Sequence, residues 1–268
     1  MRKRSVGYDA VAGLQRAATR VCLALALTFA LVTAAAAQTR TLKLYNTHTK
    51  EKVSITYKKN GRYIPSGLRE VNRFLRDWRR NEITKIDPEL LDLVWEVYQK
   101  VRAREHIYVV SSYRSPATNN MLRKRSKGVA RNSQHTLGKA MDFYIPGVNL
   151  RKLREAGLRK EVGGVGYYPK SGSPFVHMDT GRVRHWPRMT RSQLARVFPN
   201  GKTLHIPTDG KPLKGYKLAL AEAKSGKKRS TKPTIVASAP RERSRTNEQS
   251  LTRPSRETTG SGGGNILA

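Results

Sequence analysis

Apolar and polar residues alternate along residues 40–63, and the tetrapeptide KKNG at 58–61 supplies turn chemistry, so this segment predicts a β-hairpin. The period then becomes helical, with Ser66 in the capping position, and the apolar stripe consists of Leu68, Val71, Leu75 and Trp78. A second helix begins with Asp87 as its N-cap and Pro88 in its first turn. Its stripe consists of Leu91, Val94, Trp95, Tyr98 and Val101. The helical spacing favours core positions for both tryptophans.

The chain after this helix is richer in short strands. Segments 106–115, 139–146, 163–169 and 175–181 combine β-branched and aromatic residues with turn residues at their borders, and 182–186 is a further short candidate. An amphipathic helix lies between them at 149–158, with Asn149 as its cap. Early helices and late, antiparallel-looking strands predict an α+β fold whose core spans about residues 40–190.

Both ends of the chain differ from this core in composition. Residues 1–37 combine a basic start, the apolar run VCLALALTFALVTAAAA and small residues before Gln38, which is typical of a cleaved secretory signal peptide. A run of about 17 residues is near the lower limit for a membrane span, so an uncleaved anchor is the alternative. Residues 208–268 predict a basic disordered tail, with a transient helix at 216–224. The predicted folded domain is therefore 38–207.

The formal net charge is +34, from 53 basic and 19 acidic residues. Removal of residues 1–37 leaves 48 basic and 18 acidic residues, so the basicity belongs to the exported protein and indicates a polyanionic neighbour. The tail lacks interleaved aromatic residues, and export separates the chain from cytoplasmic nucleic acid, which disfavours nucleic acid as the partner. Cys22, the sole cysteine, lies in the signal segment, so a metal site must use His, Asp and Glu.

His135, Asp142 and His177 form the candidate metal site. Two imidazoles and a carboxylate suit zinc, whose catalytic sites take three protein ligands and leave one position for water. Gly138 gives the loop between the first two residues the freedom to turn back on itself. The alternative is that these histidines are solvated, or cap helices, in ordinary polar loops. The residues alone leave both interpretations open.

Two charged residues extend this candidate site. Asp179 follows His177 by two residues, so both side chains face one side of a strand. This spacing predicts that Asp179 orients a histidine, holds the attacking water or acts as general base. Arg114 stands at a strand end beside the candidate cleft, where it either stabilises developing charge or forms a structural salt bridge.

Four motifs resemble those of the zinc D-Ala-D-Ala metallopeptidases (LAS type), and more narrowly those of the periplasmic murein endopeptidases in that superfamily. They are SSYRS (111–115), SQHTLGKAMDF (133–143), GGVGYYP (163–169) and FVHMDTG (175–181). The resemblance covers about residues 40–188. It implies a small antiparallel sheet flanked by helices, with zinc in a cleft over the sheet.

The resemblance also implies roles for individual residues. It implies His135, Asp142 and His177 as Zn(2+) ligands. Arg114 matches an arginine that faces substrate, and Ser133 a residue that supports a ligand or contacts substrate.

The general base is where this chain departs from the family pattern. Many relatives place the base two or three residues before the last ligand, where this chain has Phe175 and Pro174. Neither side chain accepts a proton. Asp179 is therefore the first candidate for the base or for a group that orients a ligand, and His185 is the second.

These observations predict a periplasmic or secreted zinc metallopeptidase that hydrolyses the peptide cross-links of peptidoglycan, a murein endopeptidase. A D,D-carboxypeptidase of the same chemistry and a non-catalytic peptidoglycan-binding module are the alternatives. Peptidoglycan is the predicted partner. The basic tail predicts additional binding to other anionic polymers of the envelope.

Overall fold

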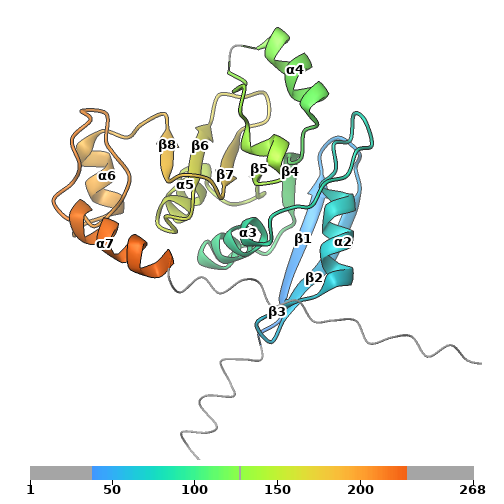
Figure 1. Ribbon diagram of the computed structural model, residues 1–268, viewed down its shortest axis with the longest axis horizontal. Helices are drawn as coiled ribbons and strands as arrows, with labels where there is room; N and C mark the ends of the chain where they lie inside the picture. The colour runs from blue at the N-terminus through green and yellow to red at the C-terminus, as the bar shows by residue number, and fades with distance from the viewer. Residues whose placement is uncertain (1–37, 127, 228–268) are drawn as a thin grey trace, which may run out of the picture. The chain divides into compact units, whose positions relative to one another are not determined.

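The structure is a computed structural model that describes residues 38–126 and 128–227. Its strands are β1 (Arg40–Asn46), β2 (Lys52–Lys59), β3 (Arg62–Tyr63), β4 (Ile107–Ser111), β5 (Ala140–Tyr144), β6 (Gly164–Tyr168), β7 (Phe175–Asp179) and β8 (Arg184–Trp186). Its helices are α2 (Pro65–Phe74), α3 (Pro88–Lys100), α4 (Pro116–Arg125), α5 (Leu150–Leu158), α6 (Arg191–Val197) and α7 (Tyr216–Lys227). A 3-10 turn, η1 (Gln134–Leu137), precedes β5 (Figure 1).

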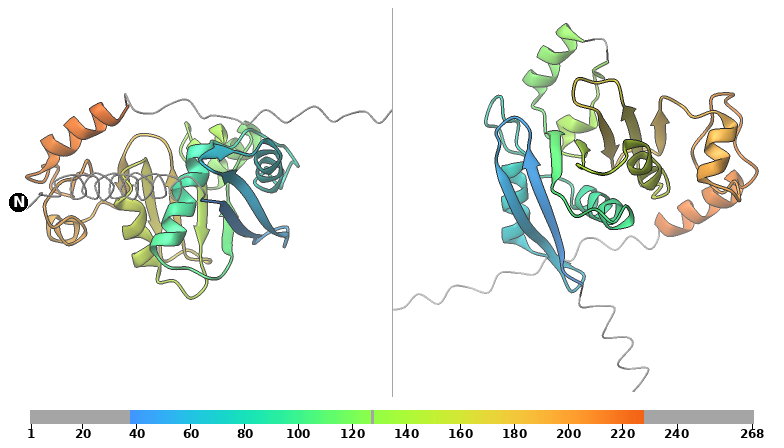
Figure 2. Two further views of the ribbon diagram at one scale, coloured as in Figure 1. Left: turned by 90° about the horizontal axis from the view of Figure 1, so that it is seen from below. Right: turned by 180° about the vertical axis from the view of Figure 1, so that it is seen from behind.

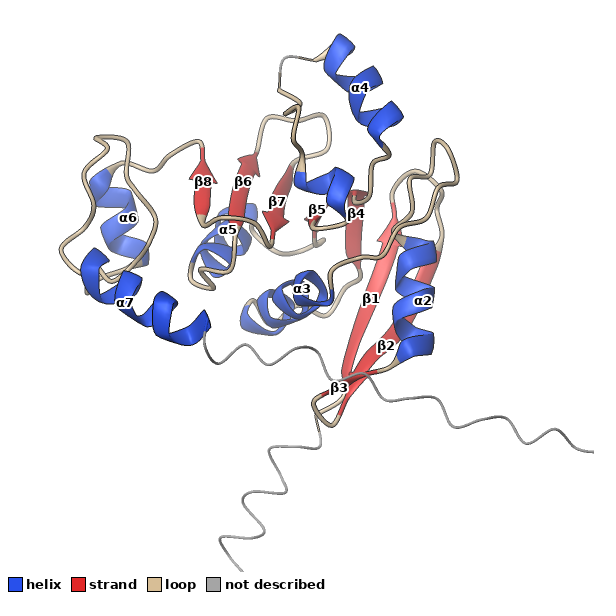
Figure 3. Ribbon diagram, in the orientation of Figure 1, coloured by secondary structure: helices blue, strands red, loops and turns tan. Residues whose placement is uncertain are grey.

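All eight strands form one sheet in the order β3-β2-β1-β4-β5-β7-β6-β8 (Figure 3). The α+β class is confirmed, but the expectation of a small antiparallel sheet is wrong. β1 pairs with β4 in parallel, and β6 pairs with β8 in parallel. Parallel neighbours require a crossover connection, and the first crossover carries α2 and α3 between β1 and β4. Such pairings join segments far apart in sequence, which local patterns do not reveal.

Local chemistry explains where two of the helices begin. The Asp87 side chain accepts a hydrogen bond from the Glu89 amide at 3.0 Å, and Pro88 occupies the first helical position of α3. The Asn149 side chain accepts from the amides of Arg151 and Lys152 at the start of α5. Both predicted caps are confirmed.

Helix α2 differs from its prediction at both ends. It begins at Pro65 with Ile64 as N-cap, and no side chain caps it, so the predicted Ser66 cap is wrong. It ends at Phe74, and Trp78 lies beyond it, 37% exposed and stacked on the His48 ring at 4.5 Å. The predicted core position is therefore wrong for Trp78.

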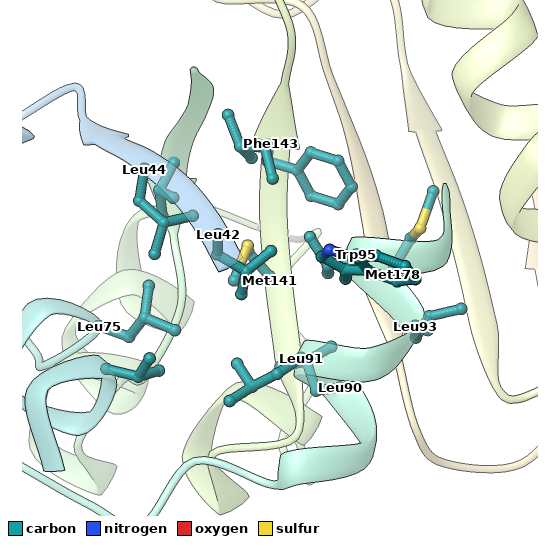
Figure 4. Close-up of a cluster of buried hydrophobic side chains, with 14 of the residues drawn as sticks. Leu42, Leu44, Leu75, Leu90, Leu91, Leu93, Trp95, Met141, Phe143 and Met178 are labelled. Atoms are coloured by element: carbon teal, nitrogen blue, oxygen red, sulfur yellow. The ribbon is translucent and has the colours of Figure 1, made fainter. Parts of the chain in front are cut away.

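The main hydrophobic core lies between one face of the sheet and helix α3. Helix α3 contacts β1, β7 and α5. Figure 4 shows side chains of α3 and of the sheet packed together, among them Leu90, Leu91, Trp95, Met141, Phe143 and Met178. Burial of these large apolar groups is the main favourable term in folding. Trp95 is buried, as the helical spacing predicted.

A second hydrophobic cluster joins the end of the sheet to the chain that follows β8. It consists of Leu158, Val165, Met189, Leu194, Val197, Phe198 and Leu213. Thr190 and Gln193 form a capping box at the start of α6. Figure 2 shows α6 and α7 beyond the β8 end of the sheet.

The predicted disordered tail begins too early in the chain. Residues 208–227 are folded: Leu213 is buried in the second cluster, and Tyr216–Lys227 forms α7. The lysines around Leu213 in the sequence favour a disordered segment, but burial of this one leucine fixes the segment against the folded domain. The predicted signal peptide at 1–37 and the tail from residue 228 lie outside the described residues. Within the described ranges, no helix is long and apolar enough to cross a membrane.

Candidate metal centre

Strand register places two of the three candidate ligands side by side. Asp142 of β5 pairs with His177 of β7, which also pairs with Gly166 of β6. Neighbours of these residues on the same strands, such as Met141 and Met178, belong to the hydrophobic core. Because side chains alternate along a strand, Asp142 and His177 lie on the face opposite that core.

Trp186 extends this row by one strand, because it pairs with Gly166. Its ring centroid lies 5.0 Å from that of His177. A Cβ at position 166 would lie 2.7 Å from the Trp186 ring and 2.9 Å from the His177 Cβ. Glycine at position 166 therefore allows the tryptophan to pack against the histidine.

The 3-10 turn η1 brings His135 to the same face. The Ser133 hydroxyl accepts from the His135 amide at 3.3 Å and caps the turn. Gly138 ends it with a φ of 66°, the left-handed conformation that glycine adopts without strain. The Arg114 amide donates to the His135 carbonyl at 3.2 Å, which ties the turn to the end of β4. The predicted turning back of this loop is confirmed.

Three ligand atoms converge at the centre of this face. His135 Nε2 lies 3.2 Å from His177 Nδ1 and 3.2 Å from an Asp142 carboxylate oxygen. His177 Nδ1 lies 2.8 Å from the other Asp142 oxygen. All three residues are at most 8% exposed. Among the described residues, this is the one group of three or more His, Cys, Asp or Glu side chains whose ligand atoms lie close enough together to hold a metal ion.

The outer nitrogens of both rings have partners that fix the tautomers. His135 Nδ1 lies 2.6 Å from the Ser112 carbonyl oxygen, which only accepts, so this nitrogen carries the proton. His177 Nε2 lies 2.9 Å from the Asp179 carboxylate and is likewise the donor. In the neutral rings, the two inner nitrogens then present lone pairs to each other and to the Asp142 carboxylate. These converging lone pairs and the carboxylate repel one another unless a positive charge lies between them.

The donor set fits a divalent metal ion. Tetrahedral zinc with bonds of about 2.0–2.1 Å places its ligand atoms about 3.3 Å apart, close to the separations found here. The carbonyl and carboxylate behind the imidazoles are the supports that metal-binding histidines use.

The pKa shifts of this cluster follow from burial and from Asp142. Burial lowers the pKa of His135. Burial acts in the same direction on His177, but hydrogen bonds to Asp142 and Asp179 outweigh it and raise its pKa. Burial alone would raise the pKa of Asp142, but both histidines hold it well below its usual range. The cluster therefore attracts one positive charge, which is a proton on His177 or a metal ion in its place.

Asp179 is completely buried behind His177, on the far side of the imidazole from the converging atoms. Its Oδ1 accepts from the amides of Gly164 and Gly181 at 2.9 and 2.8 Å. Arg184 donates to both carboxylate oxygens, at 3.0 and 2.7 Å. Burial alone would raise the pKa of Asp179, but His177 and Arg184 hold it well below its ordinary value. These contacts occupy the acceptor sites of the carboxylate.

Arg114 lies beside the cluster with its guanidinium free of ion pairs among the described residues. Its Nε is buried and has no hydrogen-bond partner in this part of the chain. Burial lowers the pKa of Arg114, and the charge of Asp142 opposes that shift. A substrate anion or a developing negative charge would satisfy this side chain.

His185 is the predicted site residue that the structure does not bring to the cluster. On β8, Arg184 and Trp186 face the cluster, so His185 between them points to the opposite face. Its Nε2 accepts from the Met189 amide at 2.9 Å, and its ring packs against His205. The structure therefore does not place His185, the second candidate for the general base or for a supporting or substrate-binding group, beside the cluster.

Ser112, Arg184 and Trp186 support the site and were not singled out from the sequence. Ser112 acts through its backbone carbonyl, which any residue type supplies, so no sequence signal marks it. The other two flank His185 in the RVRHW segment (182–186). Strand alternation there would have indicated that one face carries both of them and the other face carries the histidine.

Comparison with known proteins adds a family match. The sequence model of the family described as Peptidoglycan L,D-endopeptidase MepK matches residues 34–186. The protein of that name from Escherichia coli (strain K12) is 45% identical over 157 residues, which are 59% of this chain and 85% of the relative. The probable peptidoglycan L,D-endopeptidase MepK of Haemophilus influenzae is 40% identical over 148 residues, 55% and 78% of the two chains. No solved structure matches the chain.

Proposed function

The chain belongs to the peptidoglycan L,D-endopeptidase MepK family, and we propose that it hydrolyses peptide cross-links of peptidoglycan with zinc held by His135, Asp142 and His177. The observation that carries the proposal is the convergence of two imidazole lone pairs and a carboxylate within 3.2 Å of one another. Its relatives are named for the L,D bond, so the proposed scissile amide joins an L-centre to a D-centre.

Zinc bound at this cluster would polarise the scissile carbonyl and lower the pKa of a bound water towards about 7. His135 and His177 keep their inner nitrogens unprotonated for it, because the outer protons are committed to Ser112 and Asp179. Of the roles predicted for Asp179, we propose the orientation of His177. Its buried, fully bonded carboxylate has no free acceptor site for the proton of an attacking water.

Arg114 is proposed to stabilise the negative charge that develops on the carbonyl oxygen, or to hold a substrate carboxylate. A partly buried guanidinium, with its Nε buried and no ion-pair partner in the described ranges, supports this role. Ser133 is proposed to act through the turn that it caps, since its hydroxyl accepts from the His135 amide.

We also propose that residues 1–37 export the protein to the periplasm, where peptidoglycan lies, and that the residues from 228 onward form a basic tail. Their composition supports both statements. Long-range attraction would concentrate so basic a chain near anionic wall polymers.

Digestion of purified sacculi, followed by muropeptide analysis, tests the proposed activity. The wild-type chain should reduce cross-linked dimers, and a chelator should abolish the reaction until zinc is restored. Release of terminal D-Ala with intact cross-links would identify a carboxypeptidase. Binding to sacculi without any hydrolysis by the zinc-loaded protein would identify a binding module.

A further inference from the structure

A pocket with a volume of about 680 Å³ lies at the ends of β6 and β8. Its lining includes Arg154, Tyr167, Tyr168, Lys170, Arg188 and Gln193. Three of these residues are cationic, and no aspartate or glutamate of the described chain lines it. The pocket therefore combines positive charge with two aromatic rings.

Arg154 is the unusual member of this lining. It lies on α5, is only 6% exposed, and places its guanidinium 4.8 Å over the Tyr167 ring. One of its terminal nitrogens donates to the Pro187 carbonyl, while its Nε is buried without a partner among the described residues. No carboxylate of residues 38–126 or 128–227 forms an ion pair with it.

A buried charge without a counter-ion is unfavourable, because its hydration is lost and nothing replaces it. Burial accordingly lowers the pKa of Arg154. Its positive charge also depresses the pKa of the neighbouring His185 and His205, after burial itself. Tyr167 and the charge of Glu155 offset the effect of burial only in part, and no carboxylate of the described residues bonds to this guanidinium, so an anionic ligand in the pocket would complete its neutralisation.

Tyr168 connects the pocket to the metal centre. Its hydroxyl accepts from Trp186 Nε1 at 2.6 Å, and Trp186 packs against His177. Its ring stacks on Phe175 at 4.6 Å, two residues before His177 on β7. Tyr168 thus lines the pocket and also contacts the residues beside the metal ligands. Tyr168 faces the metal side of the sheet, whereas Tyr167 and Arg154 lie on the other side, so a peptide held at the metal centre would reach Arg154 by passing Tyr168 at the end of β6.

We propose that this pocket is a subsite that binds a carboxylate of the peptidoglycan stem peptide, with Arg154 as the charged contact. The inference rests on the proposed function, because stem peptides carry such carboxylates. A planar guanidinium matches a carboxylate with two parallel hydrogen bonds. The aromatic rings pack against the aliphatic part of the residue, and exposed Lys170 and Arg188 add attraction at the rim.

The test compares two cross-linked muropeptides that differ only in amidation of the stem-peptide carboxylates. The wild-type chain should show a KM for the free carboxylate form about tenfold or more below that for the amidated form, as expected for charge-assisted hydrogen bonds. Arg154→Gln should remove this difference by raising the KM of the carboxylate form, with kcat and zinc content unchanged. Arg154→Lys should restore part of the preference.

Arg151→Gln is the matched control, because Arg151 is exposed on the same helix and its change removes the same charge. It should retain the full preference. If Arg154→Gln does not fold, the double variant Lys170→Gln, Arg188→Gln replaces it and should reduce the preference about threefold, as expected for partly screened rim charges.

Two outcomes overturn the subsite while leaving the proposed function intact. One is equal KM values for both muropeptides with the wild type, and the other is an undiminished preference in the Arg154 variant, or in the double variant that replaces it. If the wild type cleaves neither muropeptide, the proposed function fails. In that case the Kd values of the two muropeptides test the subsite in place of KM. The wild type should bind the free carboxylate form more tightly than the amidated form, and the Arg154 variant should bind both equally.

Discussion

Two pairs of buried histidines in this protein have similar geometry and different surroundings. The rings of His135 and His177 lie 5.0 Å apart at 65°, and those of His185 and His205 lie 5.0 Å apart at 88°. All four residues are at most 7% exposed. Ring distance and burial therefore do not tell a metal site from a structural contact.

The two pairs differ in the hydrogen-bond partners of their imidazole nitrogens. In the first pair, Ser112 and Asp179 hold the outer protons, and Asp142 completes a set of three converging donors. In the second pair, His185 Nε2 accepts from an amide and His205 Nε2 donates to the Leu158 carbonyl.

The charges beside the two pairs also differ in sign. Asp142 lies within hydrogen-bond distance of both rings of the first pair, and its carboxylate attracts a cation. Arg154 is the nearby charge that acts on both His185 and His205, and its guanidinium repels a cation. The surrounding carboxylates and cations, rather than the histidines, decide which pair can hold a metal.

Replacement of one histidine of each pair by alanine should give the largest difference between the two pairs. His135→Ala removes a ligand, so metal content should fall to near zero and kcat/KM by about a thousandfold or more, because the metal contributes several kcal/mol to the reaction. His205→Ala should leave metal content and kcat/KM nearly unchanged. It should instead lower the free energy of unfolding by about 2–4 kcal/mol through a cavity and a lost hydrogen bond.

Metal analysis, sacculus digestion and urea denaturation of both variants measure these effects. A His205→Ala protein that folds normally but loses its metal would remove the distinction between the two pairs.

The second histidine pair should make the free energy of unfolding fall at acid pH. Burial, with the charge of Arg154, lowers the pKa of His185 to about 3 and that of His205 to about 4. Both are depressed relative to the unfolded chain, at about 6.5. Above pH 6.5 both histidines are neutral in the folded and the unfolded chain, so they do not change the free energy of unfolding. Below pH 6.5 the unfolded chain binds protons at these histidines and the folded chain does not, so the free energy of unfolding falls.

The expected loss at pH 5 is roughly 2 kcal/mol for each histidine. Urea denaturation at pH 8 and pH 5 measures it, and His205→Gln should lose about 2 kcal/mol less than the wild type over the same interval. Equal pH dependence in the two proteins would show that His205 is not buried as a neutral ring.

The parts that the sequence predicted are those that depend on neighbouring residues. Asp87 with Pro88 and Asn149 mark helix starts through contacts within one turn. The His135–Asp142 and His177–Asp179 spacings predicted a cluster because each pair lies on or beside one strand. The left-handed Gly138 follows from the same local reasoning.

Contacts between distant segments could not be predicted in this way. The parallel pairing of β6 with β8 determines which face His185 occupies, and no local pattern contains that pairing. Leu213 folds the region after 207 by packing on residues far back in the sequence. Arg154 did leave a signal, because it lies four residues after Leu150 and next to Leu153 on the apolar face of α5. A charged residue on such a face predicts a buried charge.

Asp179→Asn is the smallest of these changes and tests what distinguishes the first pair. The amide keeps the shape of the side chain but loses the negative charge that holds the proton on His177 Nε2 and balances Arg184. Loss of such a supporting carboxylate typically weakens metal binding about 10–100-fold, so activity should fall at low zinc and largely recover at saturating zinc. Competition with a chelator measures the affinity. Asp209→Asn removes an exposed carboxylate that pairs with Arg191 and should change neither quantity. If Asp179 were the general base, kcat would instead remain low at saturating zinc while metal affinity stayed close to that of the wild type.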